Sequence, residues 1–231
     1  MARSGTLVEL YAPANETALA RGTSQIARHR TVSTRTSLCF AEWHAAEWLA
    51  ALRSIARGRI ASGPTLDELN KELVACLGGG RHVELVNAGR VALAIALATF
   101  QKRRPRRKRV IVPAYICKSV VDTVLAAGLE PLAVDIGTDL NLTYDNVAAA
   151  IDECVLAVIA PHMYACPAPI EALDALCRAA DVHLVDDAAQ VLGITQNNRS
   201  LGTFGDVGLL SFAQSKTIVT GVRGSGGALI V

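Results

Sequence analysis

The feature of this sequence that most constrains its fold is an alternation of two kinds of segment from about residue 60 onward. Short runs rich in Val, Ile and Leu alternate with longer stretches whose apolar residues recur at helical spacing. Strands that alternate with single helices are typical of right-handed βαβ units. The pattern therefore predicts an α/β fold, a three-layer sandwich in which helices cover both faces of a mostly parallel sheet.

The expected elements can be placed from these periods. We expect strands at about 82–86, 109–112, 131–135, 155–160, 182–185, 207–212 and 228–231. We expect helices at about 90–101, 117–127, 145–152 and 169–180. An earlier helix is predicted from a capping box at Thr65-Leu66-Asp67-Glu68 and a stop at Gly78-Gly79-Gly80, with Leu66, Leu69, Leu73 and Cys76 or Leu77 as its apolar positions.

Composition excludes several classes of protein. With 51% hydrophobic residues, 19% charged residues and a net charge of +2, the chain of 231 residues is neither disordered nor collagen-like. The longest largely apolar run, Val91 to Phe100, has ten residues, of which Thr99 is polar, and is too short to cross a bilayer. We therefore expect a globular protein without a membrane partner.

The N-terminal region, residues 1–59, is expected to be an arm with helices that precedes a domain at 60–231. Its first 40 residues are rich in Ser, Thr and Arg and poor in acidic residues, which resembles a transit peptide only weakly, and a mobile arm explains the same composition. The start has no apolar segment typical of a secretory signal, so we expect a cytoplasmic protein. Trp43, Trp48 and Leu49 are expected on one helix face.

The cysteines form no C-x-x-C pair and have no histidine at the spacing of a zinc site. There are six of them: Cys39, Cys76, Cys117, Cys154, Cys166 and Cys177. Most lie within apolar segments, so we expect buried, reduced thiols rather than disulfides, and no metal site.

A cluster of positive charge occupies residues 102–109, where seven of eight residues are Lys or Arg. Such a run fits either a nucleic-acid-binding patch or a solvated loop between a helix and a strand. No aromatic residues interleave with the charges, and a single loop lacks a surface that reads bases. The loop is the favoured interpretation, and nucleic acid is not an expected partner.

Ligands of parallel α/β sheets bind outside the carboxyl ends of the strands, so the residues that follow each strand are candidates for a site. After the first predicted strand, Asn87-Ala88-Gly89-Arg90 opens a helix with small residues, which suits a phosphate but also occurs in ordinary turns. After the strand that ends at Val185 come Asp186 and Asp187. Two adjacent buried carboxylates need a cationic partner, unless one of them caps the following turn.

Lys216 follows the strand predicted at 207–212 and precedes a glycine-rich stretch. It is either an ordinary surface lysine or an amine available for a Schiff base. Pyridoxal 5'-phosphate (PLP) requires a phosphate cradle, a carboxylate for its ring nitrogen and an amine for its aldehyde. The three candidate groups together therefore favour PLP as the cofactor.

In this order the residues resemble the DegT/DnrJ/EryC1/StrS family of sugar aminotransferases, PLP-dependent enzymes of fold type I. The resemblance runs from about Ser62 to Val231, and its most specific part is Asp186-Asp187-Ala188-Ala189-Gln190 followed by Ser211-Phe212 with Lys216. The other matching segments are Ser62-Gly63-Pro64, Asn87-Ala88-Gly89, Val112-Pro113-Ala114-Tyr115, Pro131 to Asp135, His162-Met163-Tyr164, Leu201 to Asp206 and Gly226-Gly227-Ala228.

The resemblance implies a role for each candidate residue. Lys216 would form the Schiff base with the cofactor, Asp187 would pair with the pyridine nitrogen, and Gln190 would lie against the ring near its hydroxyl. Ser211 and the turn Ala88-Gly89-Arg90 would hold the phosphate. The implied reaction is amino transfer from an amino acid, with glutamate the expected donor, to a keto group of a nucleotide-linked sugar, in a homodimer.

Three departures from the family pattern bear on this interpretation. Arg90 stands where the family usually has Thr, although Arg also contacts phosphate. The aromatic residue that usually stacks on the cofactor falls near Cys117, two positions from Tyr115. Family members continue into a small C-terminal domain, which we expect to be lacking here.

The alternative to an aminotransferase is a truncated, non-catalytic protein that binds cofactor or dimerises. Dehydratases of the same family carry His in place of Lys216, so a dehydratase is not favoured.

Overall fold

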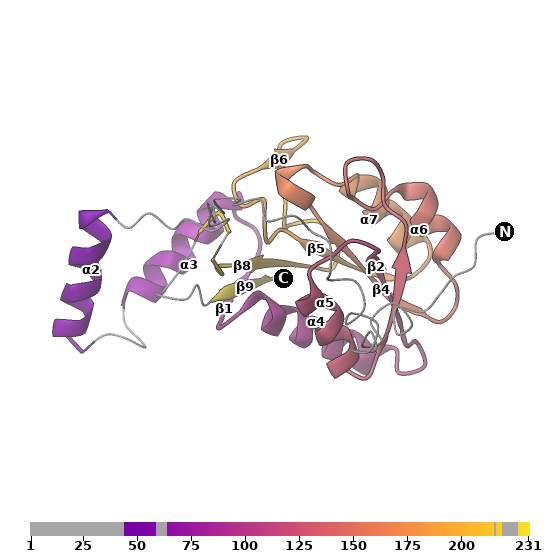
Figure 1. Ribbon diagram of the computed structural model, residues 1–231, viewed down its shortest axis with the longest axis horizontal. Coiled ribbons are helices and arrows are strands. Elements are labelled where there is room, and N and C mark those ends of the chain that lie inside the picture. The colour runs from indigo at the N-terminus through magenta and orange to yellow at the C-terminus, as the bar shows by residue number, and fades with distance from the viewer. Residues whose placement is uncertain (1–43, 59–63, 215, 219–225) are drawn as a thin grey trace, which may run out of the picture.

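The computed structural model describes residues 44–58, 64–214, 216–218 and 226–231, and its centre is a seven-stranded sheet (Figure 1). The strand order is β1-β9-β8-β5-β4-β2-β3. All neighbouring pairs are parallel except those of β9, which runs antiparallel to β1 and to β8. The seven strands are β1 (Val83–Val86), β2 (Arg109–Pro113), β3 (Glu130–Val134), β4 (Val155–Pro161), β5 (His183–Asp187), β8 (Val207–Ser211) and β9 (Gly227–Ile230). The predicted mostly parallel sheet is confirmed.

Helices cover both faces of this sheet, as Figure 1 shows. On one face, α4 (Gly89–Arg103) and α5 (Lys118–Ala126) bury residues such as Leu93 and Val124 in one apolar cluster. On the other face, α3 (Pro64–Cys76), α6 (Tyr144–Ala150) and α7 (Ile170–Ala179) contribute residues such as Leu73 and Leu173 to a second cluster. Every residue of β4 is buried, because helices cover it from both sides. The three-layer α/β sandwich is therefore confirmed.

The predicted strands and the four helices after residue 82 lie within two residues of their observed bounds. Three short elements were not expected: the 3-10 turn η2 (Met163–Ala165) and the hairpin of β6 (Thr195–Gln196) with β7 (Arg199–Ser200). Helical or β periodicity cannot be detected in segments of two or three residues.

The capping-box prediction was wrong, because α3 begins at Pro64 and Thr65 lies inside its first turn. Proline is favoured at the first helical position, where its fixed φ suits the helix and no partner is needed for an N–H. The apolar face was also only partly correct. Leu73 and Leu77 are buried and Leu69 is half-buried, whereas Leu66 is exposed. Of the alternatives Cys76 and Leu77, the structure thus places Leu77 in the core.

The expectation of buried thiols was wrong for most of the described cysteines. Cys177 is buried, and burial raises the pKa of its thiol to about 12. Cys76, Cys117 and Cys166 are exposed, and Cys154 is half-buried. An apolar stretch does not reveal which of its positions faces the core. The five described cysteines are free thiols, and Cys39 lies outside the described residues.

The helix α2 (Ala45–Ala56) precedes the sandwich and buries none of its residues. Trp48 and Leu49 are 56% and 51% exposed. Trp43, which was expected on the same helix face, lies outside the described residues. In the described parts of the chain, no helix combines the length and the apolar character that a membrane crossing requires.

The basic run at 102–109 connects the end of α4 to the start of β2, which confirms that it is a loop between a helix and a strand. Arg104 and Arg107 pair with Asp181. Arg109 pairs with Asp152 at 2.5 Å. Part of the basic charge is therefore neutralised within the domain.

Candidate cofactor site

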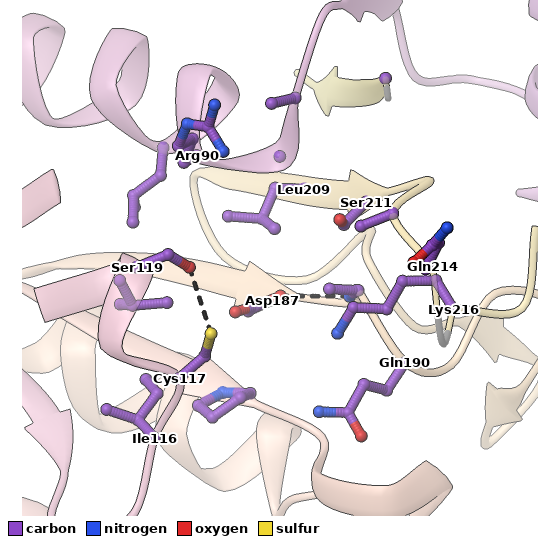
Figure 2. Close-up of a pocket in the computed structure, with 18 of the residues that line it drawn as sticks. Arg90, Ile116, Cys117, Ser119, Asp187, Gln190, Leu209, Ser211, Gln214 and Lys216 are labelled. Carbon is purple, nitrogen blue, oxygen red and sulfur yellow. Dashed lines mark hydrogen bonds between the residues drawn. The ribbon is translucent and has the colours of Figure 1, made fainter. Parts of the chain in front are cut away.

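A cavity of about 380 Å³ opens at the carboxyl ends of the strands, next to the N-terminal end of α4. All the predicted site residues line it, although they come from three separate parts of the chain: Ala88, Gly89, Arg90, Asp187, Gln190, Ser211 and Lys216. Figure 2 shows Asp187 in the middle, with Lys216 and Gln190 on one side and Cys117 on the other. The fold thus brings the sequence-predicted residues together, because parallel strands end at the same edge of the sheet.

The N-terminal end of α4 forms one wall of the cavity. A Cβ atom on Gly89 would lie only 3.0 Å from Cβ of Ser211 and 3.1 Å from the carbonyl oxygen of Leu210. Glycine is therefore what allows this helix to start directly against the end of β8. The first turn of a helix carries free N–H groups and the positive end of the helix dipole, so this wall suits a phosphate.

Asp186 is fully buried and does not face the cavity. One of its carboxylate oxygens accepts a hydrogen bond from Nε2 of His162 at 2.8 Å. The other accepts the backbone N–H groups of Gly202 at 2.7 Å and Phe204 at 3.0 Å. The backbone N–H of Ala168 donates to Nδ1 of His162, which places the ring proton on Nε2. Asp186 is thus a structural residue that ties three segments together.

The sequence analysis missed this partner of Asp186. His162 is 24 residues away in the chain and becomes a neighbour only because β4 and β5 pair in parallel, with Pro161 opposite Asp187. The available signal was the position of His162, directly after a fully apolar strand, where a buried histidine needs a polar partner.

Asp187 points into the cavity from the end of β5. Among the described residues, the one hydrogen-bond donor to its carboxylate is the backbone N–H of Ala189, at 3.1 Å. Burial raises the pKa of the Asp187 carboxyl, although this N–H group and the charge of Lys216 act in the opposite direction. A buried carboxylate with so few partners is a suitable site for a ligand that brings a positively charged nitrogen.

Lys216 extends its amine into the cavity toward Asp187 (Figure 2). Gln190 is held in place from outside, because its Oε1 accepts the backbone N–H of Tyr164 at 2.9 Å. Cys117 lines the cavity and lies at the N-cap of α5, with its Sγ 3.2 Å from Oγ of Ser119. Tyr115 is not part of the lining, so at the position where the resemblance placed an aromatic residue the cavity presents a thiol.

The donor set of this cavity fits PLP. The start of α4 with Ser211 suits a phosphate, Asp187 suits a protonated ring nitrogen, and the amine of Lys216 suits an aldehyde. The glycine at position 89 lets the start of α4 lie close to Ser211, because a Cβ there would crowd β8. Among the described residues, no cluster of three or more metal-binding side chains is present.

The fold and the cavity define the class of protein: the three-layer domain has the fold of a DegT/DnrJ/EryC1/StrS aminotransferase from Brucella abortus, which matches with a TM-score of 0.69 at 28% identity over 79% of this chain and 50% of that chain. PseC from Helicobacter pylori, an aminotransferase involved in pseudaminic acid biosynthesis, matches with a TM-score of 0.77 at 20% identity. That match covers 84% of this chain and 52% of PseC.

The chain belongs to the DegT/DnrJ/EryC1/StrS aminotransferase family, whose model matches residues 43–231. It is 32% identical to GDP-perosamine synthase from Vibrio cholerae over 145 residues, which are 62% of this chain and 39% of the relative. It is also 32% identical to the UDP-N-acetyl-3-dehydro-alpha-D-glucosamine 3-aminotransferase of Acidithiobacillus ferrooxidans over 158 residues, 68% of this chain and 42% of the relative. The chain thus spans about two fifths of the length of these curated relatives.

Proposed function

We propose that this chain is the cofactor-binding part of a PLP-dependent aminotransferase that moves an amino group from glutamate to a keto group of a nucleotide-linked sugar. The observation that carries the proposal is the convergence of Asp187, Lys216 and the start of α4 on one cavity. The substrate class is supported by the relatives, whose names describe nucleotide-sugar aminotransferases and dehydratases.

The chain's residues divide the work in this proposal. Ser211 and the turn Ala88-Gly89-Arg90 bind the phosphate, and Asp187 holds a proton on the ring nitrogen. Lys216 would hold the cofactor covalently, and its amine would carry a proton as general base and then as general acid. When bound, PLP supplies an electron sink for charge that develops on the amino-bearing carbon.

Amino transfer is favoured over dehydration, although some relatives are dehydratases. The family resemblance implies that dehydratases carry a histidine in place of the cofactor-binding lysine. Here a lysine, Lys216, occupies that position and lines the cavity. Its amine can serve both as the covalent attachment point and as the proton carrier.

We further propose that residues 60–231 form the large domain and that residues 1–59 form an arm. The match to the family model starts at residue 43, so α2 already lies in the matched region. We place the protein in the cytoplasm as a homodimer. The free thiols of the five described cysteines support a reducing compartment, and fold type I enzymes share their active sites between two subunits.

The cofactor assignment is tested by absorbance spectroscopy. The purified chain mixed with PLP is expected to absorb at ~420 nm, as a lysine-bound aldehyde does, and to lose this band in Lys216→Ala. Lys71→Ala is the matched control, because Lys71 is exposed on α3 and does not line the cavity. Equal spectra for wild type and Lys216→Ala would disprove the assignment.

The catalytic part of the proposal is tested by adding glutamate to the PLP-loaded protein. Loss of the band shows that glutamate reacts with the bound cofactor, which is the first of the two half-reactions of amino transfer. Persistence of the band would favour the alternative, a non-catalytic fragment that binds cofactor or dimerises.

A further inference from the structure

Two tyrosines that adjoin lining residues of the cavity contact each other. Tyr115 comes two residues after β2, and Tyr164 lies in η2, after the neighbouring strand β4. Each adjoins a residue that lines the cavity, Ile116 and Met163 respectively. Their hydroxyl oxygens are 2.8 Å apart, so the two side chains form a hydrogen-bonded pair, here called the tyrosine pair.

The backbone that carries Tyr164 is strained. Tyr164 has φ 50° and Ala165 has φ 64°, so two consecutive residues with side chains occupy the left-handed region. This conformation is unfavourable for both, because the Cβ atom crowds the following carbonyl oxygen. Such a turn persists only when its surroundings impose it.

Hydrogen bonds from two sides impose this conformation. Asn141, which is fully buried, accepts the N–H of Met163 at 2.9 Å and donates to the carbonyl of Cys166 at 3.1 Å. From the cavity side, Oε1 of Gln190 accepts the N–H of Tyr164 at 2.9 Å. The turn is therefore coupled directly to a residue of the candidate cofactor site.

The strained turn holds the aromatic ring of Tyr164 on the surface rather than in the core. Tyr164 is 65% exposed, more than any other large hydrophobic side chain of the described residues, and Tyr115 is 49% exposed. Holding an exposed aromatic ring in a strained turn opposes stability, and strain of this kind is concentrated at functional sites. A contact with a ligand would account for the arrangement.

The tyrosine pair has the chemistry that a sugar ring requires. Its hydrogen bond uses one phenol proton and leaves the other available to a ligand. The hydrogen bond to Tyr115 raises the pKa of Tyr164, so this phenol keeps its proton near neutral pH. An aromatic face packs against the C–H groups of a pyranose, while a phenol exchanges hydrogen bonds with its hydroxyls.

We propose that Tyr115 and Tyr164 bind the pyranose ring of the nucleotide-linked sugar at the rim of the cavity and thereby select the sugar. This inference rests on the proposed function. The tyrosine pair adjoins the cavity, since its chain neighbours Ile116 and Met163 line it and the lining residue Gln190 accepts the N–H of Tyr164. The pyranose is the part of the substrate that carries the reacting carbon. A contact with the sugar rather than with the distant nucleotide is therefore the arrangement that the geometry favours.

The test uses the PLP-loaded chain with GDP-perosamine, the amino sugar in the name of one relative, and with GDP alone. The variants are Tyr115→Ala, Tyr164→Ala and Tyr164→Phe, with Tyr144→Phe on α6 as the control for an exposed tyrosine. We expect each alanine variant to weaken GDP-perosamine binding by about ten-fold more than GDP binding. In half-reactions followed at ~420 nm, KM for GDP-perosamine should rise about ten-fold more than KM for glutamate.

Tyr164→Phe retains the ring but not the hydroxyl, so its loss of affinity should fall between those of wild type and Tyr164→Ala. Equal losses of affinity for GDP-perosamine and for GDP would overturn the inference, since the tyrosine pair would then act on the nucleotide. Equal increases in KM for GDP-perosamine and for glutamate would also overturn it, since the tyrosine pair would then act on the whole cavity. A wild-type protein that responds to glutamate but does not bind GDP-perosamine would also overturn it. If PLP does not attach to Lys216, the proposed function itself fails, which is a distinct result.

Discussion

Replacement of His162 by leucine tests whether the contact between His162 and Asp186 holds the end of β5 in place. The variant removes the donor at 2.8 Å from Asp186 and the acceptor of the Ala168 N–H, both in the fully buried interior. A lost hydrogen bond to a charged group costs about 1.5–3 kcal/mol, and a buried donor left without a partner costs about 1–3 kcal/mol. Removing one partner of a buried pair typically costs about 3–5 kcal/mol in total, and we expect a loss of that size.

Urea unfolding followed by circular dichroism measures this loss, with His82→Leu as the control. His82 contacts Glu84 at 3.3 Å on an exposed surface, so its replacement should change the free energy of unfolding by less than about 0.5 kcal/mol. The double variant His162→Leu with Asp186→Leu removes the unpaired carboxylate and should recover part of the loss. A loss below about 1 kcal/mol for His162→Leu, or no recovery in the double variant, would refute the assigned role.

Three further predictions concern the cavity and its surroundings. Because burial raises the pKa of Asp187, the folded protein holds this proton more tightly than the unfolded chain, and stability without PLP falls as pH rises above the ordinary value of 3.8. At pH 7 without PLP, the free energy of unfolding of Asp187→Asn should therefore exceed that of wild type by roughly 1–3 kcal/mol, and near pH 3 the two should be equal. The same variant should bind PLP at least about ten-fold more weakly in a spectroscopic titration. Iodoacetamide with mass mapping should label Cys117, more slowly with PLP bound, and leave Cys177 unlabelled, since the pKa of that buried thiol is about 12. Gly89→Ala should push α4 away from Ser211 and destabilise the protein by about 1–3 kcal/mol, measured by urea unfolding, while raising the Kd for PLP.

The positions of the elements and of the candidate site residues could be predicted from local patterns. The fully apolar run of β4 and the helical spacing of α7 are properties of a few consecutive residues, and such periods survive in any α/β fold. Lys216, Asp187 and Gly89 could be proposed because each lies at or soon after the end of a strand, and strand ends are where such sheets bind ligands.

The roles of neighbouring polar residues could not be predicted in this way. The adjacent residues Asp186 and Asp187 are alike in the sequence, yet one is enclosed by His162 and two backbone amides while the other faces the cavity. Successive side chains of a strand point to opposite faces, so what each one meets depends on the layers packed above and below the sheet.

The sequence by itself determined that this chain forms a parallel α/β sandwich and which residues stand at its strand ends. Only the tertiary structure decided that β9 runs antiparallel between β1 and β8, that Asp186 is structural, and that Tyr115 and Tyr164 contact each other. The physical reason is the range of the interactions. Periodicity reflects neighbours within one or two turns, whereas these contacts join residues that are brought together only when the sheet has formed.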